Sequence, residues 1–164
     1  MATMTARTTI DATPERVWEV LSDFGGISQA APHLNGSVLT TEQATGVGAA
    51  RHCDIVMMGR STEEVVTRWE EGRGYSVDVK MNGVPMRKAR ADFDISVEDG
   101  ATVLTGVMSF EMPFGPLGRA MERMSAARMA RLWSGILAGF KERAETGTDI
   151  GAQTALPLEA VRVA

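Results

Sequence analysis

Three side chains of this sequence have the chemistry and the placement to act on a bound molecule: His33, Glu64 and Arg87. Glu64 and Arg87 lie on predicted strands with a parity that could turn them inward, and His33 follows a proline in a loop. A buried carboxylate has its pKa raised by desolvation, so it could act as an acid or a base. Each residue also has a plainer interpretation, as an exposed loop histidine or a solvated charge at a strand edge. We keep the three as candidate catalytic residues without a defined reaction.

Other familiar chemistries leave no pattern in the sequence. The histidines, His33 and His52, and the single cysteine, Cys53, lack the spacing of metal ligands, so we expect no metal site. The glycine pairs at 46–48 and 72–74 lack the strand-to-helix setting and the lysine of a phosphate-binding loop. We therefore expect no cofactor, and any enzyme built on this chain would be cofactor-independent.

Composition indicates a globular domain with its own core. The chain has 164 residues, of which 44% are hydrophobic and 23% charged, and this length and balance fit one domain. We predict that this domain covers residues 1–147, because a glycine at 147 ends the last periodic segment. Residues 148–164 have little charge and little periodicity, so we expect a loosely ordered tail.

Charge and hydropathy limit the partners. The net charge of −4 gives no reason to expect a nucleic-acid surface. No apolar run reaches the roughly 18 residues of a membrane helix, so we expect no integral membrane association and a cytoplasmic location. Either a monomer or a homodimer is compatible with these features.

Hydrophobic periodicity predicts an α+β architecture. A strand at 3–10 is followed by a helix that begins after Thr13 and by a second short helix near 24–30. Further strands are predicted at 37–42, 49–58, 63–70, 75–81, 87–97 and 102–112, joined by short glycine-containing turns that imply antiparallel neighbours. A helix of about 30 residues is predicted at 114–146, with an apolar stripe formed by Leu117, Met121, Met124, Leu132, Ile136 and Phe140.

Alternation along the strands separates an apolar face from a wet face, and the long helix is the obvious cover for the apolar one. The chain also contains 11 methionines, whose flexible side chains suit a deformable cavity as well as ordinary core filling. From strand parity and helix period we predict a set of cavity-lining, ligand-binding residues: Tyr75, Val77, Val79, Ala91, Phe93, Ile95, Met108, Phe110, Leu132, Gly135 and Ile136.

Three segments carry a family resemblance. They are IDATPERVWEVLSDF at 10–24, EVVTRW at 64–69 and GFKERAE at 139–145. Together with the order of elements, they resemble the START/Bet v 1-like (SRPBCC) superfamily, and most closely its bacterial polyketide cyclase/dehydratase and lipid-transport branch. The resemblance covers roughly residues 3–147 and implies a helix-grip fold, in which a curved seven-stranded antiparallel sheet wraps around the long C-terminal helix, with two short helices after the first strand.

The resemblance implies a pocket but fixes no reaction. We expect the chain to bind or transport a hydrophobic small molecule, such as a lipid, a polyketide-like compound or an isoprenoid, between the sheet and the helix. One alternative is a polyketide cyclase/dehydratase-type enzyme, and another is an interaction protein with a vestigial pocket. A cavity above roughly 300 Å³ with converging polar groups would favour the enzyme, an apolar cavity of that size would favour the carrier, and a filled interior would favour the interaction protein.

Overall fold

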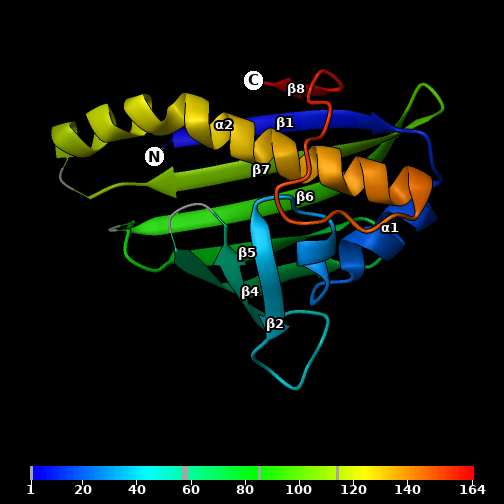
Figure 1. Ribbon diagram of the computed structural model, residues 1–164, viewed down its shortest axis with the longest axis horizontal. Coiled ribbons are helices and arrows are strands. Elements are labelled where there is room, and N and C mark those ends of the chain that lie inside the picture. The colour runs from blue at the N-terminus through cyan, green and yellow to red at the C-terminus, as the bar shows by residue number, and fades with distance from the viewer. Residues whose placement is uncertain (1, 57–58, 85, 114) are drawn as a thin grey trace.

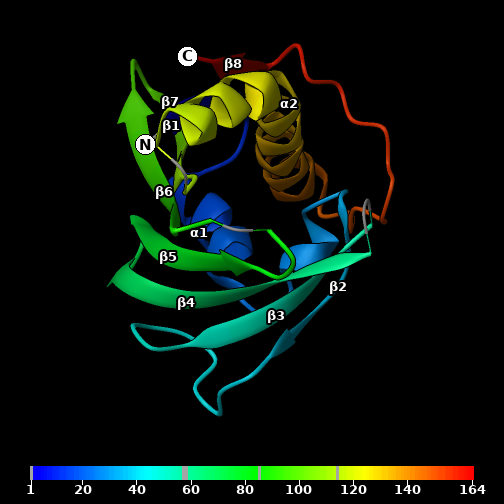
Figure 2. The same ribbon diagram turned by 90° about the vertical axis from the view of Figure 1, so that its left-hand side faces the viewer.

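The computed structural model describes residues 2–56, 59–84, 86–113 and 115–164. Its main feature is an eight-stranded antiparallel sheet with the strand order β2-β3-β4-β5-β6-β7-β1-β8. The strands are β1 (Ala2–Ile10), β2 (Leu34–Leu39), β3 (Ala50–Ile55), β4 (Arg60–Glu70), β5 (Gly74–Met81), β6 (Lys88–Glu98), β7 (Ala101–Glu111) and β8 (Val161–Val163). Figure 2 shows the sheet curving around the long helix α2 (Gly115–Thr146). This confirms the predicted helix-grip architecture, with one more strand than expected.

The six-strand meander follows from alternating sequence and tight turns. In β6, Ala89, Ala91 and Phe93 are buried while Lys88 and Arg90 are exposed, as strand parity predicts. Tyr75 and Val77 of β5 are buried on the same face, since Tyr75 pairs with Phe93 and Val77 with Ala91 across the ladder. One face of the sheet is therefore apolar, and α2 covers it.

Two short elements close one end of the grip. Helix α1 (Pro14–Ser22) begins at Thr13, whose hydroxyl accepts a hydrogen bond from Arg16 N at 3.3 Å, and Pro14 occupies its first turn. It buries Val17 and Leu21 almost completely. The second short helix is a single 3₁₀ turn, η1 (Ile27–Gln29), and is shorter than the predicted segment.

Helix α2 is continuous over 32 residues, as predicted. Its inward face in the second half is formed by Trp133, Leu137 and Phe140, which are all buried. The predicted stripe is wrong at Met124, which is 86% exposed, because the first half of the helix extends past the edge of the core. Phe114 lies outside the described residues, and the side chains of Leu117 and Met121 are not described either.

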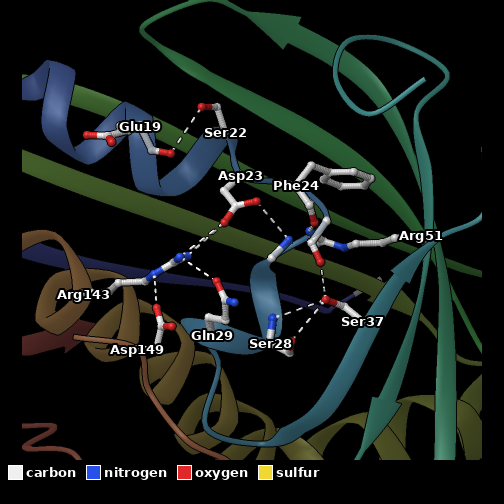
Figure 3. Close-up of polar contacts among 12 residues, drawn as sticks. Glu19, Ser22, Asp23, Phe24, Ser28, Gln29, Ser37, Arg51, Arg143 and Asp149 are labelled. Atoms are coloured by element: carbon white, nitrogen blue, oxygen red, sulfur yellow. Dashed lines mark hydrogen bonds and ion pairs between the residues drawn. The ribbon is translucent and has the colours of Figure 1, made fainter. Parts of the chain in front are cut away.

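The C-terminal half of α2 is fixed to the η1 region by a close backbone approach. A Cβ atom on Gly139 would lie 1.8 Å from the carbonyl oxygen of Ala30, so only glycine allows this packing. Nearby, Arg143 donates hydrogen bonds to Asp23, Gln29 and Asp149 (Figure 3). These contacts join the end of α2 to the segment that leads into β2.

The C-terminal segment packs against the domain and adds a short strand, neither of which was predicted from the sequence. Ile150 and Val161 are buried, and Ile150 N donates to the carbonyl oxygen of Gln29 at 2.7 Å. The segment crosses α2 and adds β8 to the free edge of β1 (Figure 1). It escaped prediction because β8 has only three residues, too few to show a period.

Candidate functional site

An apolar cavity of about 110 Å³ lies between the concave face of the sheet and α2. Its apolar wall comes from the η1–β2 region, from strands β3 and β5 to β7, and from the middle of the helix. The residues of this wall are Ile27, Leu34, Ile55, Val77, Val79, Met81, Ala91, Phe93, Met108, Met129, Leu132, Trp133 and Ile136. Three of them are methionines, whose unbranched side chains can adapt to the shape of a ligand.

Seven residues of the predicted ligand-binding set line this cavity, and their role in binding remains a prediction. They are Val77, Val79, Ala91, Phe93, Met108, Leu132 and Ile136. Five of them are alternate residues of the central strands on the face that the helix covers, and Leu132 and Ile136 come from the helix itself.

The other four predicted residues lie outside the cavity lining. Tyr75 is fully buried behind it, stacked on Trp69 with ring centroids 5.7 Å apart. Phe110 is buried in the core and Ile95 is half-buried farther along β6. Gly135 faces a separate side pocket, because it lies one residue before Ile136 on the helix and therefore points about 100° away.

The polar end of the cavity is formed by Arg51 and Glu64, which face each other on the neighbouring strands β3 and β4. Nε and Nη2 of Arg51 both donate to Oε2 of Glu64, at 2.9 and 2.5 Å. Thr62 Oγ1 donates to the other carboxylate oxygen, Oε1, at 3.2 Å. The arginine side chain is 1% exposed and the glutamate 14%, so this is a largely buried ion pair.

Further contacts hold the guanidinium of Arg51 in place. Nη1 donates to the carbonyl oxygen of Phe24 at 2.7 Å, and the Phe24 ring lies 4.0 Å from the guanidinium carbon (Figure 3). Burial disfavours the charged guanidinium, but the carboxylate of Glu64 more than offsets this, so the pKa of Arg51 is raised above its usual value. Arg51 therefore carries a full positive charge that Glu64 compensates.

His33 lies at the edge of the same cavity, in the turn between η1 and β2. Its Nδ1 atom is buried and has no hydrogen-bond partner among the described residues. Burial lowers the pKa of His33 to about 4, against the opposing attraction of Glu64. The ring is therefore neutral at physiological pH. The structure places two of the three candidate catalytic residues, His33 and Glu64, at one cavity.

Arg87 does not join them, and its predicted inward orientation is wrong. Its side chain is 68% exposed, and its Nη1 atom lies 3.6 Å from Oε1 of Glu111 on the outer side of the sheet edge. The parity with Ala89 fails because the strand begins only at Lys88, so Arg87 belongs to the preceding turn.

Arg51 was missing from the predicted site, although the sequence contained a signal for it. It shares strand parity with Cys53 and Ile55, which alternate with His52 and Asp54. That alternation places Arg51 on the inner face, where a charge needs a partner. The partner could not be identified without the register that sets β3 against β4.

Cys53 and Tyr75 complete the buried surroundings of the ion pair. Burial raises the pKa of the Cys53 thiol to about 12, and the nearby carboxylate of Glu64 adds to the effect. Burial also raises the pKa of Tyr75, whose hydroxyl has no hydrogen-bond partner among the described residues. Within the described part of the chain, no group of three or more His, Cys, Asp or Glu side chains is arranged to hold a metal ion.

A second hollow of about 280 Å³ adjoins the central cavity and shares His33 and Leu132 with it. Gly135 and Pro32 form its floor, and residues 153–156 of the C-terminal segment form its outer wall. Gln153 N donates to the carbonyl oxygen of Pro32 at 2.6 Å, which holds that wall in place.

The central cavity differs from each of the three cases set out from the sequence. It is smaller than the roughly 300 Å³ expected of an enzyme or carrier pocket, yet the interior is not filled. Its polar groups converge, but Arg51 and Glu64 are bonded to each other. The cavity is therefore a small apolar space whose one ion pair is compensated internally.

A curved antiparallel sheet closed around one long helix, with a cavity between them, defines the helix-grip class of α+β proteins. The chain belongs to the polyketide cyclase/dehydrase and lipid transport family, whose sequence model matches residues 1–145. This confirms the resemblance to the START/Bet v 1-like superfamily. The family and the fold together support a ligand-binding role. The sequence model of the family ends at residue 145, before the C-terminal segment that contributes β8.

Solved structures show the same fold at low sequence identity. XoxI from Bacillus cereus is 17% identical with a TM-score of 0.69, covering 87% of this chain and 94% of its own. DynU16, described as a protein of the dynemicin biosynthetic locus, is 18% identical with a TM-score of 0.68, covering 92% of this chain and 50% of its own. Ara h 8.0201 is 13% identical with a TM-score of 0.66, covering 87% of this chain and 97% of its own.

Comparison with curated protein sequences gave no significant match. Among the described residues, no helix has both the length and the apolar character needed to cross a membrane.

Proposed function

We propose that this protein binds a compact hydrophobic small molecule in the central cavity, as a carrier or sequestering protein. A small lipid, a polyketide-like compound or an isoprenoid unit would each present the apolar surface that the cavity requires. The observation that carries the proposal is the composition of the lining, in which thirteen residues are apolar and the polar ones meet at one end. Ligand sites of this kind use apolar surface for affinity and a few polar groups for orientation.

The three lining methionines bear on the size of the ligand. Met81 lies at the end of β5 and Met129 lies on α2, and both side chains are only partly buried. Met108 lies deeper, on β7. Because methionine side chains change rotamer at low cost, the cavity can enlarge around a ligand that exceeds its present 110 Å³.

A cyclase/dehydratase activity is the second candidate, and the neutral ring of His33 beside Glu64 is the observation that favours it. It is the weaker candidate because Arg51 already holds the carboxylate that would transfer the proton. The two functions separate by experiment. Turnover of a poly-ketone substrate that His33→Ala or Glu64→Gln eliminates, in a protein that remains folded, would establish the enzyme.

Trp133 gives a direct test of binding, since it lines the cavity and its ring lies 5.2 Å from that of Phe93. In a Trp18→Phe, Trp69→Phe background, it becomes the only tryptophan. Bromobenzene is neutral, of single-ring size, and quenches tryptophan fluorescence on contact. We expect saturable quenching of Trp133, with a midpoint that shifts when an unlabelled apolar ligand competes.

Ala91→Phe and Gly135→Ala form a matched pair for this test. Ala91 lines the central cavity, so a phenyl group there should fill it and abolish saturable quenching. Gly135 faces the side pocket, where the nearest described atom to an added Cβ is Pro32 Cγ at 3.7 Å, so Gly135→Ala should quench as before. Both changes are made in the single-tryptophan background. Quenching that rises linearly with bromobenzene concentration in the background protein and in both variants would show collisional contact only and would contradict the proposal.

A further inference from the structure

We propose that the polar end of the cavity selects an uncharged, hydroxyl-bearing ligand, whose O–H group donates a hydrogen bond to Glu64, and that it rejects carboxylate ligands. This inference rests on the ligand-binding function proposed above and adds the chemical class of the ligand. It is carried by the charges and the hydrogen-bond capacity of Arg51, Glu64, His33 and Thr62, which are the polar residues of the described lining.

The charges at this end sum to zero. Arg51 and Glu64 form a contact ion pair, in which two N–H groups of the arginine reach one carboxylate oxygen. His33 adds no charge, because its half-buried ring, with Nδ1 enclosed, is neutral at physiological pH. A ligand carboxylate would therefore lose its hydration without gaining a compensating positive charge, and burying such a charge unpaired is costly.

Three of the five N–H groups of Arg51 are already used within the protein. Its three nitrogens donate to Glu64 and to the carbonyl oxygen of Phe24, and the ring of Phe24 lies over the guanidinium. A ligand anion at the remaining N–H groups would lie close to the carboxylate of Glu64, whose negative charge repels it, and an anion that displaced Glu64 would leave a buried, unpaired carboxylate.

Glu64 keeps capacity to accept one more hydrogen bond. Oε2 takes both bonds from Arg51, whereas Oε1 takes, among the described residues, only the longer bond from Thr62 at 3.2 Å. A carboxylate oxygen can accept two hydrogen bonds, so Oε1 has a free acceptor site. The glutamate side chain is 14% exposed and lines the cavity, which makes it the natural partner of a phenol, enol or alcohol O–H group.

The test compares three small molecules that differ only at one end of a methyl-substituted ring: p-cresol, p-xylene and 4-methylbenzoate. Affinities are measured by NMR titration of the full-length protein near neutral pH. A hydrogen bond to a charged acceptor predicts that p-cresol binds at least about fivefold more tightly than p-xylene. The benzoate should bind at least about tenfold more weakly than p-cresol.

Two variants make the test specific to the ion pair. Glu64→Gln leaves the charge of Arg51 uncompensated, so the benzoate should gain affinity relative to p-cresol, and the order of the two should reverse. If this variant does not fold, the double variant Arg51→Met with Glu64→Leu removes both charges together. In that protein p-xylene should bind at least as tightly as p-cresol.

The outcomes separate this inference from the proposed function. If wild-type protein binds p-xylene, p-cresol and the benzoate with similar affinity, or binds the benzoate best, the inference is overturned while ligand binding stands. If none of the three molecules binds, and bromobenzene also fails to quench Trp133 in a saturable way, the proposed function itself is overturned.

Discussion

Arg51 and Glu64 are direct cross-strand neighbours on β3 and β4, and two N–H groups of the arginine converge on one oxygen of the glutamate. The arginine is 1% exposed and is one of the largest fully buried side chains of the described core. A charge so deeply buried is tolerated only because its partner lies within hydrogen-bond distance. The pair therefore ties the polar end of the cavity to the stability of the fold.

Removal of one partner should cost far more than removal of both. Glu64→Leu leaves the buried guanidinium of Arg51 uncompensated, so we expect the free energy of unfolding to fall by about 3–5 kcal/mol. Arg51→Met with Glu64→Leu should recover most of this loss, because apolar residues of similar volume then fill the site. Urea denaturation measures both changes.

The exposed pair Arg7–Glu98 is the control for this prediction, with side chains 45% and 48% exposed. Glu98→Ala should cost less than about 1 kcal/mol. If Glu64→Leu is as mild as Glu98→Ala, the ion pair at the cavity does not contribute as described.

Two glycines four residues apart on α2 should respond to alanine with opposite signs. A Cβ on Gly139 would lie 1.8 Å from the carbonyl oxygen of Ala30, so Gly139→Ala must push the helix from the η1 region and cost about 1–3 kcal/mol. For a Cβ on Gly135 the nearest described atom is Pro32 Cγ at 3.7 Å, an ordinary contact, so Gly135→Ala should stabilise the helix by up to about 1 kcal/mol. Thermal and urea unfolding of the two variants measure the difference, and equal effects would contradict the close approach.

His33 should make the protein less stable in mild acid. Its pKa is lowered to about 4 in the folded protein, whereas an unfolded histidine titrates near its ordinary value of about 6.5. Between these values the unfolded state binds more protons than the folded state. The contribution of the neutral His33 ring to the free energy of unfolding is therefore present above pH 6.5 and is lost as the pH falls toward 4. We expect wild type to lose roughly 2–3 kcal/mol more than His33→Phe between about pH 7.5 and 4.5.

His52 is a control, because the pH dependence of its contribution to stability should have the opposite sign to that of His33. Glu63 and then Asp54 raise its pKa through hydrogen bonds, so its contribution is present below about pH 6.5 and is lost as the pH rises through the raised pKa. His52→Gln should therefore destabilise the protein more in mild acid than in alkali. If His33→Phe shows the same pH dependence as wild type, desolvation does not keep the ring of His33 neutral as described.

Cys53 should be inert in the folded protein. The thiolate is the reactive form, and burial together with the carboxylate of Glu64 raises the pKa of this thiol to about 12. We expect no reaction with a disulfide reagent at about pH 8 until guanidinium chloride unfolds the chain, when one thiol per chain reacts. Rapid labelling of the native protein would mean that β3 opens readily.

Most of the fold could be predicted from the sequence because its strands alternate strictly and its turns are short. The same parity located Val77, Ala91 and Phe93 on the cavity wall. Parity fails where a strand is irregular. In β4 the register shifts between Val66 and Arg68, so Arg68 pairs with Ser76 on the outer side although it shares sequence parity with Val66.

The parts of the site that were missed depend on contacts between distant segments. Arg51 could be placed on the inner face by its alternation with Cys53, but its partner Glu64 is fixed only by strand register. Trp133 was hidden because the predicted helix stripe followed Met124, whereas the buried face is set by where α2 meets the sheet. The pairing of the C-terminal segment with β1 depends on a free strand edge that local sequence does not reveal.

The most direct test of the account is to locate a bound ligand. An isotope-filtered NOE experiment on protein saturated with p-cresol reports which protein protons lie beside its ring and methyl group. We predict contacts to the Ala91 methyl group, to the methyl groups of Met108 and Met129, and to Trp133, all of which line the central cavity. Contacts confined to the outer surface groove around Arg7 and Glu159, with none to Ala91 or Met108, would contradict the central claim.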